Sequence, residues 1–238
     1  VLKINPSDDS TSTFGTLSGS DKWLGGVLAA NDIIYGIPHD STTILKLDPS
    51  DDSISTFGSL SGSNKWSGGV LAFNSMIYGI PYDSTEFLKL NPATDSTGIF
   101  GSLAGSAKWS GGVLAPNGMI YGIPYDSTTV LKINPINDTA STFGSLSGSA
   151  KWAGGVLAPN GIIYGIPYTE TEVLRIDPTT DTVSTFSNII GSAKWFGGVL
   201  ALNGMVYGIP YSETKVLKLG NQVDVQEDFP LSRYWNKL

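Results

Sequence analysis

Residues 151–193 read KWAGGVLAPNGIIYGIPYTETEVLRIDPTTDTVSTFSNIIGSA, and this stretch decides the fold. Four short segments in it have the composition of β-strands: GGVLA, IIYGIP, EVLRID and TVSTF. Turn-forming residues separate them, and Asn160-Gly161 between the first two is a strong hairpin signal. No window repeats its apolar residues with a helical period over helical length. The stretch therefore predicts an antiparallel unit of four strands.

The unit occurs five times, with a fixed period of 43 residues. A Lys-Trp pair keeps the register, at Lys22-Trp23, Lys65-Trp66, Lys108-Trp109, Lys151-Trp152 and Lys194-Trp195. A period in this range is typical of β-propellers, whose four-stranded units cannot bury their apolar faces alone. We predict an all-β fold, a five-bladed β-propeller with four antiparallel strands per blade.

The predicted propeller covers residues 1–219. Its repeats are 1–43, 44–86, 87–129, 130–172 and 173–215, followed by a closing strand at 216–219 and a C-terminal tail at 220–238. We expect strands from the two termini to close the ring in one blade, with Thr11–Phe14 completing the blade that begins at Trp195. An open solenoid is the alternative, but it would leave two unprotected sheet edges.

The bulk composition excludes several function classes. The formal net charge of -7 disfavours nucleic acid, because phosphate binding needs a basic surface. No segment approaches the roughly 20 apolar residues of a membrane span, so we expect no membrane insertion. The absence of cysteine excludes disulfides and thiolate metal sites. The compartment stays open, with an extracellular location as our expectation; the sequon Asn137-Asp138-Thr139 would be usable only there.

The stretch WSGGVLAPNGMIYGIPY, from Trp109 to Tyr125, resembles the core of the tachylectin-2 family of five-bladed propeller lectins. Those repeats combine a tryptophan, an apolar first strand, a Pro-Asn-Gly turn and an apolar-aromatic second strand in a similar order. The resemblance implies carbohydrate binding. The repeat departs from that family in lacking its Asp-Asn-Trp segment, so the sugar-binding residues of the family are not carried over.

A second stretch, NGMIYGIPYDSTTVLKINPINDTASTF from Asn117 to Phe143, is similar to repeats of streptogramin-lyase-like propellers. The resemblance implies the same fold. Those lyases use a histidine with a carboxylate and a divalent metal, whereas the single histidine here, His39, stands where the other repeats have tyrosine. We therefore predict a tyrosine-like spacing role for His39, no catalysis, no metal and no cofactor.

The Lys-Trp pairs are the first candidate ligand-binding residues. Each pair lies in the loop that enters the inner strand of a blade, where an exposed indole could stack on a sugar while the lysine and a nearby serine donate hydrogen bonds. The alternative is structural: each tryptophan wedges between blades with its N–H bonded to a carbonyl. Carboxylates of the Asp9 type would then cap the lysines, although residues of this type also read as turn formers.

The second candidate is the segment after the proline that ends each second strand. It mixes donors and acceptors, as polar ligands require, although its residues could equally bond within their own turn. Its aromatic members are Tyr82, Tyr125, Tyr168 and Tyr211.

The C-terminal tail turns from acidic to aromatic and basic. Phe229, Arg233, Tyr234 and Trp235 are residue types that anchor protein interfaces. The tail could bind another subunit or pack against the propeller itself.

These observations predict a multivalent carbohydrate-binding protein, a lectin with up to five equivalent weak sites, whose partners are glycans of unknown class. Linked sites raise avidity by about 10²–10⁴ without new contacts. The alternative is a non-catalytic structural or protein-interaction subunit, docked through the propeller face and the tail.

Overall fold

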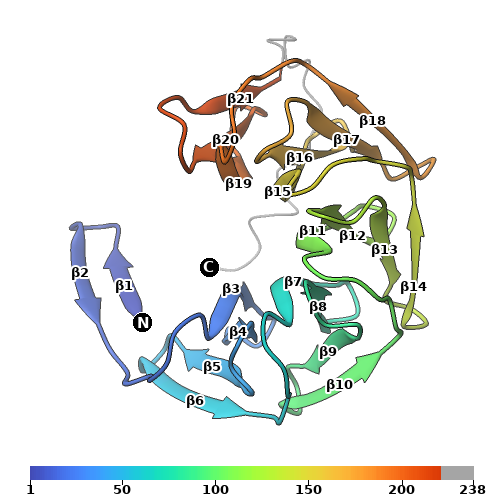
Figure 1. Cartoon of the computed structure of the whole chain (residues 1–238). Helices are drawn as coiled ribbons and strands as arrows, with labels where there is room; N and C mark the ends of the chain where they lie inside the picture. The colour runs from blue at the N-terminus through green and yellow to red at the C-terminus, as the bar shows by residue number, and fades with distance from the viewer. Residues whose placement is uncertain (221–238) are drawn as a thin grey trace.

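A computed structural model describes residues 1–220, and these residues form a ring of small antiparallel sheets around a central axis (Figure 1). No helix occurs in the described part of the chain, so none there could cross a membrane. Five of the sheets are blades whose first strand lies innermost, and the sixth is a two-stranded hairpin at the N-terminal end of the chain.

The strands of the N-terminal hairpin and the first two blades are β1 (Leu2–Asn5), β2 (Ser10–Thr13), β3 (Trp23–Leu28), β4 (Ile34–Pro38), β5 (Ile44–Asp48), β6 (Ser53–Phe57), β7 (Trp66–Leu71), β8 (Ile77–Pro81), β9 (Phe87–Asn91) and β10 (Ser96–Phe100). The remaining strands are β11 (Trp109–Leu114), β12 (Ile120–Pro124), β13 (Val130–Asn134), β14 (Thr139–Phe143), β15 (Trp152–Leu157), β16 (Ile163–Pro167), β17 (Val173–Asp177), β18 (Thr182–Phe186), β19 (Trp195–Leu200), β20 (Val206–Pro210) and β21 (Leu217–Leu219).

The predicted five-bladed propeller of four antiparallel strands per blade is confirmed. The blades that begin with β3, β7, β11 and β15 each have four strands in sequence order, as the 43-residue period indicated. The fifth blade, β19-β20-β21, has three strands among the described residues.

The blades pack through a repeated apolar interface. Ile37 and Ile44 of the first full blade belong to one core cluster with Trp66, Leu88 and Leu90 of the next, and all five are buried. At this interface one blade supplies β-branched side chains, and the facing side of the next supplies the indole and two leucines. The large side chains that propellers need between blades include the repeat tryptophans.

Glycines line the axis because the inner strands nearly touch there. Each inner strand has a bulge after its tryptophan, and Gly154 in one such bulge has a φ of 79°. A Cβ at Gly154 would lie 3.0 Å from the Cα of Gly197 in the following blade. The expectation that small residues stand where blades crowd around the channel is met here.

The expected closure of the ring is wrong for the described residues. β2 pairs only with β1, through a register of four residue pairs from Leu2–Thr13 to Asn5–Ser10, and does not join the blade of Trp195. β21 itself takes the third place in that blade, so β1 has no free position beside β20. The hairpin and the last blade thus border an opening of the ring (Figure 1).

Candidate functional site

The repeat tryptophans are wedged between blades. Trp109 is 2% exposed, and its Nε1–H donates to the carbonyl of Thr129 at 2.9 Å. The same bond recurs in every repeat, from Trp23 to Thr43, Trp66 to Glu86, Trp152 to Glu172 and Trp195 to Lys215. Trp23, in the blade beside the hairpin, is half-buried and the others are buried. The exposed stacking platforms that carbohydrate binding would need are therefore absent at the four buried positions, and the structural alternative accounts for them.

The lysines before these tryptophans fasten the loops of adjacent blades. Lys108 is buried, and its Nζ donates to the carbonyls of Tyr82 at 2.9 Å, Ser84 at 2.8 Å and Gly105 at 2.8 Å. Burial lowers the pKa of Lys108. Lys65, Lys151 and Lys194 are buried in the same way, and Lys22 is half-buried. Carbonyls, and not the expected Asp9-type carboxylates, cap these lysines.

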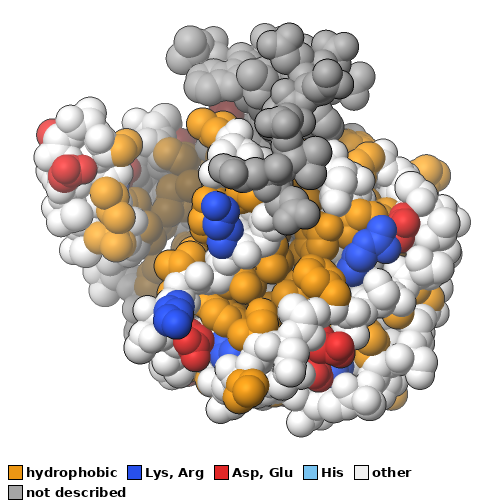
Figure 2. Space-filling model, turned by 90° about the horizontal axis from the view of Figure 1, so that it is seen from above, with side chains coloured by type: hydrophobic (Ala, Val, Ile, Leu, Met, Phe, Trp, Pro, Cys, Tyr) orange, Lys and Arg blue, Asp and Glu red, His pale blue; other side chains and the backbone are white. Residues whose placement is uncertain are grey.

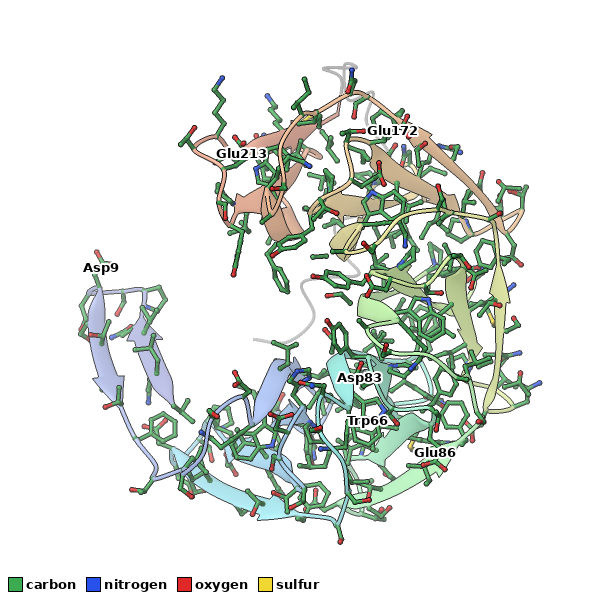
Figure 3. All side chains as sticks on the ribbon, viewed as in Figure 1. Asp9, Trp66, Asp83, Glu86, Glu172 and Glu213 are labelled. Carbon is green, nitrogen blue, oxygen red and sulfur yellow. The ribbon has the colours of Figure 1, made fainter. Side chains whose placement is uncertain are left out.

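The second candidate set forms a continuous aromatic girdle on the same face of the ring. The girdle consists of His39, Tyr82, Tyr125, Tyr168 and Tyr211, one from each blade. Neighbouring ring centroids are 5.8, 5.9, 5.9 and 5.6 Å apart along this series. Figure 3 shows Asp83, the neighbour of Tyr82 in sequence, together with Trp66 toward the inner part of their blade. The structure thus brings together side chains that are 43 residues apart in sequence.

The phenol groups of the girdle have free hydrogen-bonding capacity. The rings of Tyr82, Tyr125 and Tyr168 are half-buried, and no buried side-chain oxygen in the described residues lacks a partner, so their unbonded hydroxyls reach solvent. Burial raises the pKa of Tyr125 to about 12, with Tyr82 and Tyr168 adding to the effect. The hydroxyl of Tyr125 therefore stays protonated at neutral pH and can both donate and accept hydrogen bonds.

Carboxylates behind the girdle fix its position. Asp83 accepts the backbone N–H of Ala107 at 2.6 Å, and Asp126 accepts that of Ala150 at 2.6 Å. Both alanines have a positive φ, at 46° and 48°, which the Lys-Trp loop requires to present its N–H. The girdle loops of Tyr82 and Tyr125 are thus each held by the loop of the next blade.

His39 occupies the first place in the girdle, where the other repeats have tyrosine. Its Nδ1 lies 3.1 Å from the carbonyl oxygen of Trp66, and its ring contacts Tyr82. The position fits the predicted tyrosine-like spacing role, and it also makes the girdle chemically unequal around the axis.

Sequence reasoning missed a polar network on the opposite face of the ring. Tyr78 donates from its hydroxyl to Asp138 Oδ1 at 2.8 Å, and Lys89 Nζ donates to Asp138 Oδ2 at 2.5 Å. Asn74 donates to the hydroxyl of Tyr78 at 3.1 Å and to the carbonyl of Pro135 at 2.9 Å. The carboxylate comes from the outer turn of the next blade, so the network joins blades.

The same network occurs at two further interfaces, through Asn31, Tyr35, Lys46 and Asp95 and through Asn117, Tyr121, Lys132 and Asp181. The predicted turn role of the Asp9-type residues fits their positive φ. The signal for their second role was available, since Asn, Tyr, a basic residue and Asp recur at fixed positions of the repeat.

No cluster of three or more metal-ligating side chains occurs in residues 1–220. The tail residues Phe229, Arg233, Tyr234 and Trp235, predicted to bind a partner, lie outside the described residues.

Comparisons with known proteins place the chain by family and by fold. A family model described as "Repeat of unknown function (DUF6923)" matches residues 69–227. No curated protein matches the sequence closely enough to count as a relative.

Three solved structures are similar in fold. A streptogramin B lyase matches with a TM-score of 0.76 and 13% identity, over 89% of this chain and 69% of the lyase chain. The extracellular domain of a one-component system from B. thetaiotaomicron matches with a TM-score of 0.67 and 12% identity, over 88% of this chain and 30% of that one. An auxiliary nutrient binding protein from Bacteroides ovatus matches with a TM-score of 0.63 and 13% identity, over 84% of this chain and 55% of that protein's chain.

The similarity to streptogramin-lyase propellers is confirmed at the level of fold, and it corrects our exclusion of catalysis. Enzymes share this propeller at low sequence identity, so a single histidine in the sequence is no ground for excluding an enzyme. The comparisons do not show the resemblance to tachylectin-2 lectins, which stays a prediction.

Proposed function

We propose that this chain, which belongs to the DUF6923 repeat family, binds a carbohydrate at the aromatic girdle on the axis of its propeller. The observation that supports the proposal is the girdle itself, in which half-buried phenol rings present free hydroxyls. Sugars combine apolar C–H faces with hydroxyl groups, and aromatic rings with polar tips match both parts.

The spacing of the girdle favours one shared site. Neighbouring rings are 5.6–5.9 Å apart, which is too close for five separate sugars to bind side by side. We therefore place one ligand on the axis, contacted by several rings together, instead of five equivalent weak sites at the tryptophans.

The structural neighbours support a ligand-binding role in general terms. They include a nutrient binding protein and the extracellular domain of a one-component system. At 12–13% identity they share only the fold with this chain, so the choice of carbohydrate comes from the chemistry of the girdle.

A glycan array followed by titration calorimetry tests the proposal. We expect saturable binding of at least one glycan by the unmodified protein. Tyr125→Phe removes one hydroxyl and should weaken that binding by about tenfold, corresponding to the loss of one hydrogen bond. Tyr125→Ala also removes the ring and should weaken it further.

Tyr164→Phe is the matched control. Tyr164 lies within a second strand, and its hydroxyl accepts from Asn160 on the opposite face of the ring, so its removal should leave glycan affinity unchanged. A blank array, or equal losses for Tyr125→Phe and Tyr164→Phe, would refute carbohydrate binding at the girdle.

A further inference from the structure

The last blade exposes an apolar face that every preceding full blade buries. Ile209 in β20 is 48% exposed and Val199 in β19 is 54% exposed, whereas Ile166, the equivalent of Ile209 one repeat earlier, is 0% exposed. Ile166 is covered by the inner strand of the next blade, where a Cβ on Gly198 would approach it within 2.9 Å. The last blade therefore presents the blade-to-blade interface without an occupant among the described residues.

The same blade carries an incomplete copy of the polar network. Asn203 donates to the hydroxyl of Tyr207 at 3.1 Å, as Asn74 does to Tyr78. Tyr207 and Lys218 stand at the positions of Tyr78 and Lys89, which both bond to Asp138. Within residues 1–220 neither Tyr207 nor Lys218 has a carboxylate partner. Among the described residues, no acidic turn completes this copy of the network.

The N-terminal hairpin carries the complementary parts. Leu2 and Ile4 in β1 are 62% and 61% exposed and stand at the positions of Leu88 and Leu90, which pack on a preceding blade. Asp9 in the hairpin turn stands at the position of Asp95 and Asp138, has the same positive φ, and is exposed. Asp9 has no ion pair with the described residues, although Lys3 of the same hairpin already pairs with Asp52 of the first full blade at 2.7 Å.

The hairpin and the last blade stay separate within one chain. Figure 2 shows the hairpin standing apart from the rest of the molecule, and Figure 3 shows Asp9 at its tip. Narrowing the ring to join them would press the inner strands together, and a Cβ at Gly25 would already lie 3.1 Å from the Cα of Gly68. Docking between two chains needs no such compression.

We propose that the β1–β2 hairpin of a second copy of this chain docks on the exposed face of β19–β21. Leu2 and Ile4 then cover Ile209 and Val199, and Asp9 accepts hydrogen bonds from Tyr207 and Lys218. The contact joins different surfaces on the two chains, so it leads head to tail into dimers and longer assemblies. It is independent of the carbohydrate proposal.

Sedimentation equilibrium over a range of concentrations tests the contact. We expect concentration-dependent association that Asp9→Asn and Ile4→Ser each weaken by about tenfold. Two exposed positions outside both surfaces serve as matched controls: Asp32→Asn for charge and Ile136→Ser for apolar area should leave association unchanged. A monomer at all concentrations, or equal association of Asp9→Asn and the unmodified protein, overturns the proposal.

Cross-linking distinguishes docking between chains from ring closure within one chain. Because the chain has no cysteine, Ser7→Cys in the hairpin turn and Leu202→Cys beside Asn203 each introduce a single exposed thiol and leave Asp9 and Lys218 in place. Mixing the two variants with a short bismaleimide should give a cross-linked dimer. If the mixture stays monomeric while the double variant cross-links within one chain, the hairpin closes its own ring and the proposal fails.

Discussion

Tyrosines at neighbouring positions of one repeat have different surroundings and different uses. Tyr121 is fully buried between blades, and its hydroxyl donates to Asp181 at 2.9 Å. Tyr125, four residues later, is half-buried in the girdle and its hydroxyl reaches solvent. The first stabilises the ring and the second is available to a ligand.

The titration of the tyrosines is a direct test of this burial. Burial raises the pKa of Tyr78 and Tyr121 from 10.0 to about 12. The folded state thus binds more protons than the unfolded state between these values, and the stabilisation that is complete below pH 10 should be lost as the pH rises toward 12. Absorbance of phenolate against pH should show a group of tyrosines that ionises near 12.

The buried lysines act in the opposite direction as the pH rises toward their ordinary pKa of 10.5, because burial lowers the pKa of Lys65, Lys108, Lys151 and Lys194. Absorbance is therefore a cleaner readout than the free energy of unfolding. If all tyrosines ionise together near 10, the inter-blade packing described here is incorrect.

Lys108→Met should destabilise the protein by about 1–3 kcal/mol, because it leaves three carbonyls between the blades without their shared donor. Lys22→Met is the matched control, since Lys22 is only half-buried and belongs to the first repeat, where no full blade precedes it. Urea denaturation measures both, and similar losses for the two variants would contradict the inter-blade role of Lys108.

At the scale of the elements, the repeat period predicts where the strands lie. It does not predict which side chains of adjacent blades pack against them. The four strands of residues 151–193 follow from local signals, such as the Asn160-Gly161 turn. Whether Trp109 is exposed depends on the preceding blade, whose side chains cover it, and local composition carries no information about that contact. The girdle was a candidate from its residue types, but its continuity arises only when the blades meet at the axis.

Gly154→Ala should destabilise the protein by about 1–3 kcal/mol, since the new Cβ meets the backbone of Gly197 at 3.0 Å. Gly98→Ala is the control in a strand: nothing lies within 4 Å of its Cβ and its φ is not positive. Gly197→Ala separates the two effects, because Gly197 has a φ of 74° but no neighbour within 4 Å. If the midpoint temperature of thermal unfolding is no lower for Gly154→Ala than for Gly197→Ala, crowding at the axis is refuted.

The inter-blade carboxylates should make the fold sensitive to acid. Burial raises the pKa of Asp138, but hydrogen bonds from Lys89 and Tyr78 outweigh it, so the pKa lies below the usual 3.8. A lowered pKa gives stabilisation that is present above the unfolded value and lost as the pH falls through the folded value. Asp138→Asn should therefore lower stability at pH 7 and flatten the loss of stability in acid, as measured by urea denaturation at several pH values.

At the scale of the whole molecule, the two faces of the ring have separate roles. One face carries the girdle and its supporting Lys-Trp loops, and the other carries the Asn-Tyr-Lys-Asp networks that join blades. The repeat predicts five similar copies of every group. The five girdle residues, however, lie side by side around the axis and form one surface. We therefore expect this face to bind one ligand per chain and not five.

The stoichiometry of glycan binding tests this claim most directly. Titration calorimetry of the unmodified protein with a monovalent form of the best array ligand should give one ligand per chain, since adjacent girdle rings share one site. A value near five per chain would contradict the shared axial site, because it would mean that each repeat binds a ligand independently.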